Sequence, residues 1–358
     1  MAPQLHAGDR DLSPNTSWKD PDNPMNDFVR ATVTGRTGHL SLDRPKAMNA
    51  LVPQMISAMA ESLTSWADDD SVDRVVISST SPRAFCAGAD IRAIRAGVLA
   101  HEPWVSSFFE DEYALNLQLA HYPKPLISLM DGVAMGGGLG ISVHGSHRIV
   151  TERSVLAMPE TAIGFIPDVG ASHFLPRLPR HVGRYLGLTS ARIGGPDAVA
   201  LGLATHLCPA DRLPELQDAL LTGVDLDSAL AAVCVPVADD DVSLPLTQIE
   251  ATFGMPSVDD IVTALRRGDS EWCRSTLAAI ESVCPTTVYV TDALLQSGAR
   301  STLSECLKRE AAVGARVIAR GDFAEGVRAQ LVDKDHRPQF EPATLAEVDS
   351  ADVQSLLS

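Results

Sequence analysis

The chain has 358 residues, of which 45% are hydrophobic and 21% charged, an ordinary composition for a globular protein of one large or two moderate domains. Its formal net charge of −17 has the opposite sign to that needed for neutralising phosphates, so we expect no nucleic-acid partner. No apolar run reaches the roughly 20 residues that span a bilayer, so we also expect no membrane partner.

Residues 1–25 are rich in Pro, Asp, Asn and Ser and show no periodicity, which predicts a flexible tail. This segment is acidic, and it has neither the basic start and apolar stretch of a signal peptide nor the Arg-rich composition of a transit peptide. Six cysteines are scattered along the chain without a CxxC pair, which indicates free thiols and no metal site. These features together predict a cytoplasmic protein.

Strand and helix patterns alternate up to about residue 160. Residues 29–42 alternate apolar and polar side chains around a Gly-containing turn, which predicts a β-hairpin. The remaining elements expected here are helices at 49–66, 110–120 and 136–143 and strands at 72–78, 125–130, 147–151 and 155–157. This alternation predicts an α/β layered core, which we place at residues 26–208.

Beyond about residue 171 the patterns are mostly helical. Helices are expected at 190–204, 213–221, 258–267, 271–280, 286–297 and 301–319. Three aspartates at 239–241, with prolines on either side, mark a connector. Residues 209–358 are therefore predicted to form a mainly helical C-terminal region.

Two glycine-containing turns follow predicted strands, one at 84–90 and one at 135–138. Small residues let the backbone approach a ligand closely, and a helix N-terminus offers unpaired N–H groups. Two such groups from separate loops can converge on one carbonyl oxygen and form an oxyanion hole. Spacing alone favours the alternative that both are tight packing turns. Neither turn matches a dinucleotide fingerprint or a P-loop.

Three segments, taken in order, resemble the crotonase (enoyl-CoA hydratase/isomerase) superfamily. They are SLDRPKAMNAL at 41–51, FCAGADI at 85–91 and the glycine triplet at 136–138. The resemblance implies a crotonase-like spiral of ββα units, an acyl-CoA substrate, and no cofactor beyond the coenzyme A that the substrate carries. It also implies that the backbone N–H groups of Ala87 and Gly137 hold the thioester oxygen.

Other segments are similar to the branch of this family that hydrolyses 3-hydroxyisobutyryl-CoA. They include EDEY at 110–113, MPETAIGFIPDVG at 158–170 and DFAEGVRA at 322–329, and the similarity extends from about residue 28 to about residue 350. The implied reaction is hydrolysis of a short branched 3-hydroxyacyl-CoA thioester. The most specific form is the valine-degradation step that yields 3-hydroxyisobutyrate and CoA.

One departure separates this chain from the hydratases it resembles. Hydratases carry two glutamates, and the first falls here on Gly140, which has no side chain. Glu160 matches the second glutamate, and the resemblance implies that it acts as nucleophile or general base. Asp168 stands where hydratases commonly have glycine, with an implied role in binding the 3-hydroxyl group, positioning water or transferring protons. Glu112 matches a glutamate that contacts substrate.

Without the resemblance, each of these carboxylates has a simpler interpretation. Glu160 after Met-Pro is typical of a helix N-terminus, Asp168 after Pro is typical of a turn, and Glu112 is typical of a solvated helix face. The other residues that we predict to bind substrate lie in the two glycine turns: Gly88, Ala89, Asp90, Ile91 and Gly136. The backbone of residues 87–91 is the candidate for recognising adenine.

Basic residues near the presumed CoA loops either meet its phosphates or are solvated surface charges: Arg44, Lys46, Arg92 and Arg95. His144 and His147, three residues apart on an expected helix, are predicted to be packed or surface histidines rather than metal ligands. The competing functions are an enoyl-CoA hydratase or isomerase with one working glutamate, and a non-catalytic acyl-CoA-binding protein. Relatives often trimerise, so a homo-oligomer is expected unless the long C-terminus covers its own core.

Overall fold

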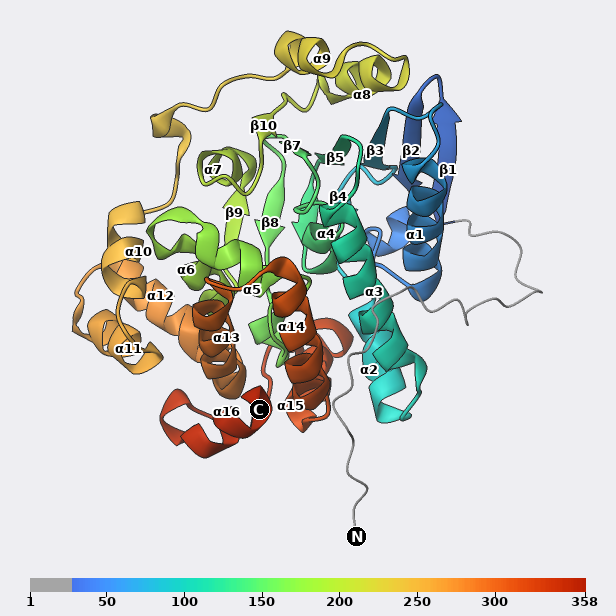
Figure 1. Cartoon of the computed structure of the whole chain (residues 1–358). Helices are drawn as coiled ribbons and strands as arrows, with labels where there is room; N and C mark the ends of the chain where they lie inside the picture. The colour runs from blue at the N-terminus through green and yellow to red at the C-terminus, as the bar shows by residue number, and fades with distance from the viewer. Residues whose placement is uncertain (1–27) are drawn as a thin grey trace.

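The computed structural model describes residues 28–358, so the tail predicted for residues 1–25 lies outside the described residues. The predicted hairpin is confirmed: β1 (Val29–Thr34) and β2 (Thr37–Leu42) pair in antiparallel register around Gly35 (Figure 1). Helix α1 (Pro53–Ala67) starts later than expected. The reason is that the buried amide of Asn49 is used by the preceding loop, where it donates to Ser79 Oγ (2.7 Å) and the Phe85 carbonyl (2.9 Å).

Two sheets form the core of the first half. The larger has the strand order β1-β2-β3-β5-β7-β10 and is parallel from β2 onward. Its further strands are β3 (Arg74–Ser79), β5 (Leu126–Met130), β7 (His147–Val150) and β10 (His206–Leu207). The smaller sheet contains β4 (Ala84–Cys86), β6 (Val133–Met135), β8 (Val155–Ala157) and β9 (Arg192–Gly194).

Three parallel strands of the large sheet each lead directly into a strand of the small sheet. The chain passes from β3 to β4, from β5 to β6 and from β7 to β8, and a helical segment follows each pair. Those after the first two pairs are α2 (Ile91–Leu99) with α3 (Trp104–Ala120), and α4 (Gly137–Gly140). This repeated connection is the spiral of ββα units that the resemblance implies.

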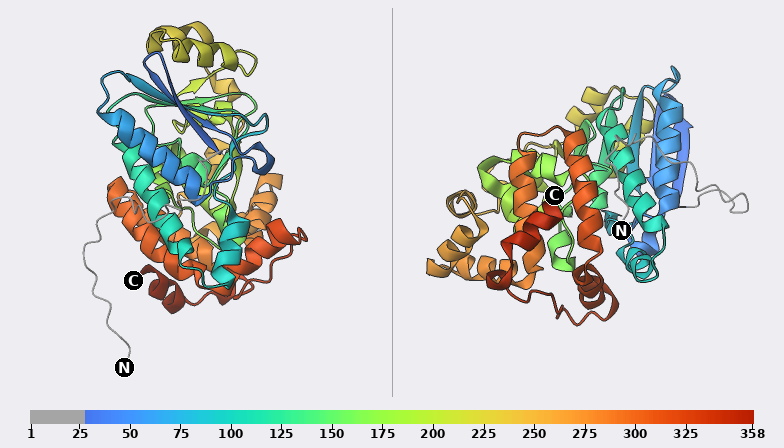
Figure 2. Two further views of the ribbon diagram at one scale, coloured as in Figure 1. Left: turned by 90° about the vertical axis from the view of Figure 1, so that its right-hand side faces the viewer. Right: turned by 60° about the horizontal axis from the view of Figure 1, so that its bottom comes forward.

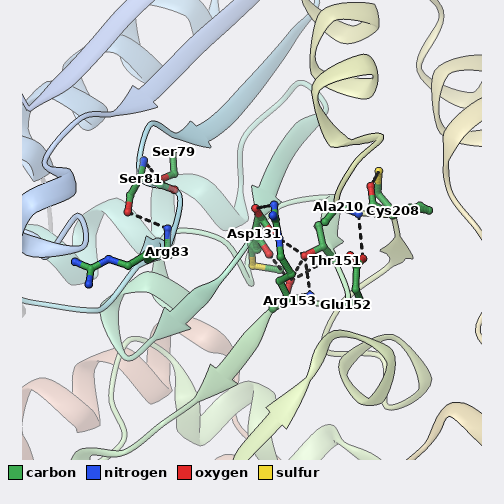
Figure 3. Close-up of polar contacts among 12 residues, drawn as sticks. Ser79, Ser81, Arg83, Asp131, Thr151, Glu152, Arg153, Cys208 and Ala210 are labelled. Atoms are coloured by element: carbon green, nitrogen blue, oxygen red, sulfur yellow. Dashed lines mark hydrogen bonds and ion pairs between the residues drawn. The ribbon is translucent and has the colours of Figure 1, made fainter.

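Short polar contacts fix the corners where the chain changes sheets (Figure 3). Thr151, which follows β7, donates through its hydroxyl to Asp131, which follows β5 (2.6 Å), and Arg153 pairs with the same carboxylate. After β3, the backbone N–H of Ser81 donates to Ser79 Oγ (2.9 Å). These side chains make hydrogen bonds where the pairing between strands ends. The segments that lead into the two glycine turns are therefore held in place.

The predicted helix at 190–204 is wrong. Residues 192–194 form β9, which pairs with β8 by placing Ile193 opposite Leu156, and α7 (Gly195–Ala200) begins only afterwards. Two consecutive glycines and Pro196 weaken a continuous helix here, and the exposed edge of β8 gains a partner. Tertiary pairing therefore overrides the apolar spacing.

The C-terminal region is helical, as expected. Its longer helices are α8 (Leu213–Leu221), α9 (Leu226–Val233), α10 (Leu246–Phe253), α11 (Val258–Arg267), α12 (Glu271–Ser282), α13 (Pro285–Gly298), α14 (Leu303–Ile318) and α16 (Ser350–Leu357). The shorter α15 (Gly321–Val327) also lies in this region, whereas α5 (Ala171–Phe174) and α6 (Val182–Thr189) precede it. None of the helices within residues 28–358 is long and apolar enough to cross a membrane.

Helix α14 packs against α3, and α15 packs against α2 (Figures 1 and 2). Two arginines of α2 extend this contact: Arg95 Nε donates to the Ala324 carbonyl (2.7 Å), and Arg92 donates to the Leu331 carbonyl (2.5 Å). A single hydrophobic cluster includes Met59 and Ile77 of the α/β core and Val313 of α14. The C-terminal helices therefore cover the side of the core from which α2 and α3 project.

Candidate active site

The two glycine turns lie against each other. Gly88 has a φ of 97°, and a β-carbon on it would come within 3.0 Å of the Met135 carbonyl oxygen and 3.5 Å of the Gly137 nitrogen. Gly136 has a φ of 50°, and Gly137 opens α4, so the Gly137 N–H has no acceptor inside that short helix. Glycine is required at 88 and 136 because both residues have a positive φ and because a side chain at either position would collide with neighbouring atoms.

The predicted oxyanion role of Ala87 does not fit the structure. Its N–H donates to the Met48 carbonyl at 3.0 Å, so it is already used in holding the turn. Two residues on, Ala89 forms a parallel bridge with Leu51 whose bonds run from Leu51 to Gly88 and from Asp90 to Leu51. In such a bridge the N–H of Ala89 points away from Leu51, so Ala89 takes the place of Ala87 as the candidate oxyanion donor.

Two glutamates flank this glycine loop. Glu160 opens the 3-10 helix η2 (Glu160–Ile163), and a β-carbon on Gly136 would lie 2.6 Å from its Oε1. Glu112, from α3, lies over Gly137 in the same way, so that a side chain there would clash with its carboxylate. Only 1% of Glu112 is exposed, so the solvated-face interpretation is wrong. Within residues 28–358, Glu112 Oε1 and Glu160 Oε2 have no protein hydrogen-bond partner.

The third carboxylate, Asp168, lies in a turn that we call the Asp168 turn (residues 168–172). The hydroxyl of Tyr113, next to Glu112 on α3, donates to Asp168 Oδ2 at 2.7 Å. His144 Nε2 donates to the carbonyl of Val169 (2.8 Å), a β-branched residue with a φ of 52°. Sequence reasoning assigned no role to Tyr113, although a buried tyrosine hydroxyl generally has a hydrogen-bond partner.

These carboxylates influence one another's protonation. Burial, followed by the charge of Asp168, raises the pKa of Glu112 and of Glu160 well above the usual glutamate value. Burial also raises the pKa of Asp168 to about 7, against the lowering effect of the Tyr113 hydroxyl. Because each negative charge disfavours the next, the cluster holds protons at neutral pH. Asp168, with a pKa of about 7, is the member of the cluster that can gain or lose a proton near neutral pH.

The position of the missing hydratase glutamate is filled by other atoms. A β-carbon on Gly140 would come within 2.7 Å of Val169 Cβ and 3.0 Å of Asn116 Nδ2. The residue after Asp168 therefore occupies the space in which a side chain at position 140 would begin.

Most of the residues expected to lie near coenzyme A instead make hydrogen bonds or ion pairs within the protein. Arg44 forms an ion pair with Asp90 (2.7 Å), which also caps α2 by accepting from the Ala93 N–H. Arg92 and Arg95 hold the C-terminal helices, and Lys46 is exposed. The Ile91 N–H donates to the Ala89 carbonyl, so part of the proposed adenine-binding backbone is internally bonded.

The expected helical alignment of His144 and His147 is wrong, because α4 ends at Gly140 and His147 opens β7. His144 is packed edge-on against Phe174 and bonded to Val169, and His147 stacks on His206 with ring centroids 6.0 Å apart. Across the described part of the chain, no group of three His, Cys, Asp or Glu side chains could hold a metal ion. All six cysteines are free thiols, which confirms that prediction.

The fold agrees with comparisons to known proteins. Residues 37–357 match the family described as enoyl-CoA hydratase/isomerase. A solved structure titled carnitinyl-CoA dehydratase from Mycobacterium thermoresistibile superposes with a TM-score of 0.87 at 38% identity, covering 93% of this chain and 97% of that one. A second, titled enoyl-CoA hydratase from Rhodobacter sphaeroides, gives 0.86 at 35% identity over 92% and 97%. The fold is therefore that of the crotonases.

Curated relatives give the same family. The zebrafish (Danio rerio) and human proteins named 3-hydroxyisobutyryl-CoA hydrolase, mitochondrial, are each 37% identical to this chain. The alignments cover 90% of this chain in both cases and 87% and 86% of those proteins. The Arabidopsis thaliana protein named 3-hydroxyisobutyryl-CoA hydrolase 1 is also 37% identical, over 88% and 87%. This chain belongs to the enoyl-CoA hydratase/isomerase family.

Proposed function

We propose that this protein hydrolyses the thioester of a short branched 3-hydroxyacyl-CoA, most specifically 3-hydroxyisobutyryl-CoA, releasing CoA and 3-hydroxyisobutyrate. The observation that carries the proposal is the arrangement of Glu160, Asp168 and Gly140. Glu160 flanks the glycine loop, Gly140 leaves no room for the first hydratase glutamate, and Asp168 supplies a second carboxylate from another turn. The names of the curated relatives support the same reaction.

In this proposal the thioester oxygen lies between the N–H groups of Ala89 and Gly137. Negative charge that develops on that oxygen is stabilised by donors fixed before the reaction, which is where an oxyanion hole is most effective. Ala89 is held by its bridge to Leu51, and Gly137 by the start of α4. Gly88 and Gly136 let these two backbones meet.

Two routes are open to the Glu160 carboxylate. It either attacks the thioester carbon, giving an anhydride that water then cleaves, or removes a proton from the attacking water. In both routes the carbon–sulfur bond breaks and the thiolate takes a proton from the carboxyl cluster. A single turnover in ¹⁸O-labelled water tests for the anhydride: water attack at the Glu160 carboxyl carbon leaves ¹⁸O in Glu160 and ¹⁶O from Glu160 in the product acid, whereas general-base catalysis puts ¹⁸O into the product acid.

Glu112 and Asp168 are the groups that we assign to the substrate's 3-hydroxyl. A buried site that hydrogen-bonds a hydroxyl rejects analogues without one, because its polar groups would then lack partners. Both side chains are buried, with 1% and 5% exposed. We therefore expect isobutyryl-CoA, which lacks the hydroxyl, to be a poor substrate.

The rival function is addition or removal of water at a carbon–carbon double bond, as the titles of the two solved structures suggest for those proteins. A panel of thioesters decides between them: CoA release is followed with a thiol reagent, and hydration by loss of the enoyl absorbance of crotonyl-CoA. Free thiol from 3-hydroxyisobutyryl-CoA supports the hydrolase, and hydration of crotonyl-CoA without any thiol overturns it. A protein that binds CoA but does neither would be the non-catalytic alternative.

The compartment, the absence of a cofactor and the oligomeric state stay predictions. The sequence favours the cytoplasm, whereas the names of the zebrafish and human relatives place those proteins in mitochondria. Size-exclusion chromatography with light scattering measures the oligomeric state directly.

A further inference from the structure

A buried carboxylate near the site has no part in the chemistry proposed above. Glu310, in the middle of α14, has no exposed surface and points at the Asp168 turn. Its Oε2 accepts a hydrogen bond from the Gly170 N–H (2.7 Å), and its Oε1 accepts from the N–H (2.8 Å) and the hydroxyl (2.5 Å) of Ser172. Two of these are backbone N–H groups, which can only donate, and all three fit the ionised form of Glu310.

The turn that Glu310 holds is strained. Val169 adopts a left-handed φ of 52°, which is unfavourable for a β-branched residue and persists only where neighbouring contacts enforce it. Gly170 follows with a φ of 86°, and the Ala171 N–H closes the turn on the Asp168 carbonyl (2.8 Å). Without its anchors, this backbone has lower-energy alternatives.

Three separate elements supply those anchors. Tyr113 of α3 holds the Asp168 carboxylate, and His144, beyond α4, holds the Val169 carbonyl. Glu310 holds the next two free N–H groups, and it lies 140 residues beyond Gly170 in the chain. Helix α14 packs on both α3 and α5, so Glu310 is itself firmly placed.

We propose that Glu310 is a positioning residue for Asp168: through Gly170 and Ser172 it fixes the turn that carries this carboxylate, and its negative charge acts on Asp168 across the turn. The inference deepens the proposed function and rests on it in taking Asp168 as part of the chemistry. Glu310 does not touch the substrate. Its role is to make the C-terminal helices part of the active site.

The charged surroundings set the direction of the electrostatic effect. The polar groups that face Asp168 are the Tyr113 hydroxyl from α3, which lowers its pKa, and Glu310 from α14, which raises it after the larger effect of burial. Glu112 and Glu160 complete the carboxyl cluster. Burial raises the pKa of Glu310, and the hydrogen bonds from Ser172 and Gly170 and the charge of Arg309 act against it in favour of the ionised form.

The deciding variants are Glu310→Gln, which removes the charge, and Glu310→Asp, which keeps the charge but shortens the reach. We expect Glu310→Gln to lower kcat for 3-hydroxyisobutyryl-CoA roughly tenfold with KM changed less than about twofold. The plot of log kcat against pH bends where Asp168 titrates, and we call this bend the pH limb. Glu310→Gln should move the limb to lower pH, whether catalysis needs the Asp168 carboxyl ionised or protonated. Glu310→Asp should lower kcat while leaving the limb near its wild-type position.

Glu305→Gln is the matched control, because Glu305 lies on the same helix but in the exposed capping box with Thr302. It should lower Tm without changing kcat or the pH limb. Wild-type kcat and an unmoved limb in Glu310→Gln would overturn the proposal. If Glu310→Gln does not fold, Ser172→Ala removes one of the three donors, and an unchanged kcat there would overturn it as well.

A second measurement does not need substrate. Tm is measured from pH 4 to pH 8 for the wild type, Asp168→Asn, Glu310→Gln and the double variant. A pH-dependent coupling between the two sites supports the proposal even if no thioester is cleaved, and additive effects at every pH overturn it. Failure of the proposed hydrolysis and failure of the Glu310 inference are therefore distinguishable.

Discussion

The hydroxyl of Tyr113 donates a 2.7 Å hydrogen bond to Oδ2 of Asp168, and both groups are almost completely buried. The bond joins α3, which also carries Glu112, to the turn that follows η2 in the chain. It favours the ionised form of a carboxylate whose surroundings otherwise favour the proton. The orientation and the charge of Asp168 therefore depend on the same hydroxyl.

Replacing Tyr113 by Phe removes this donor and keeps the ring. A hydrogen bond to a charged group is worth about 1.5–3 kcal/mol, so we expect kcat to fall by about 10- to 100-fold. The pKa of Asp168 should rise further, and the pH limb it governs should move to higher pH, the opposite direction to Glu310→Gln. The log kcat profile between pH 5 and pH 9 measures both effects. A limb that stays in place would separate Tyr113 from the titration of Asp168.

Glu160→Gln keeps the volume of the side chain and removes its basicity. We expect kcat to fall by about a thousandfold or more, since the residue that attacks or activates water is lost. Calorimetric binding of CoA should stay within about twofold of wild type. The exposed Glu61 of α1 provides the control variant Glu61→Gln, which should retain full activity. Unchanged turnover in Glu160→Gln would remove Glu160 from the mechanism.

Asp168 also couples stability to pH. Its pKa is about 7 in the fold but near 3.9 in an unfolded chain, so the folded state keeps the proton longer. Stability from this group is therefore fully present below about pH 4 and is lost as the pH rises through about 7. In Asp168→Asn this loss is absent, so Tm of the variant relative to wild type should increase from pH 4 to pH 7 and then level off. Thermal melts across this range measure the trend, and a constant difference would contradict it.

Gly140→Ala tests the packing against the Asp168 turn. The added β-carbon would lie 2.7 Å from Val169 Cβ, and overpacking of this kind costs about 1–3 kcal/mol. We expect Tm and kcat to fall together, because the strained turn must move. Gly321→Ala is the control, since nothing lies within 4 Å of a β-carbon there. Adding Val169→Gly to Gly140→Ala should restore part of the lost Tm; no recovery would mean that Val169 is not the cause.

Much of the fold could be predicted from local patterns. The hairpin, most of the strands of the two sheets and the helices after residue 210 follow from apolar periodicity, and the expected range of α11 agrees with its observed bounds. The predictions that were wrong concern segments whose structure depends on contacts with distant parts of the chain. The segment 190–204 has helical spacing, but β8 offers an unpaired edge and Ile193 takes it. Helix α4 ends early because the chain turns back into β7, which local spacing does not encode.

Sequence motifs pointed to the site residues that lie within them. They did not point to residues that reach the site through contacts between distant parts of the chain. Glu160 and Glu112 lie against the glycine turns, and the charge of Asp168 acts on both, while the roles that the resemblance implies for them stay predictions. The donor role expected of Ala87 does not fit, because its N–H already bonds to Met48, and only the structure shows which N–H groups of the turn are used in this way. Glu310 has no sequence signal: Lys308 and Arg309 precede it, and it looks like one more charge on an amphipathic helix.

The packing of Val169 beneath Gly140 also bears on how activities diverge within this family. A Gly140→Glu change would by itself place a carboxylate where Val169 stands, so the mutant would lose the existing Asp168 turn before gaining a second working acid. A change of Val169 to glycine would free the space and suit a backbone with a φ of 52°. An exchange between the proposed thioester cleavage and water addition therefore has a preferred order, in which position 169 changes before position 140.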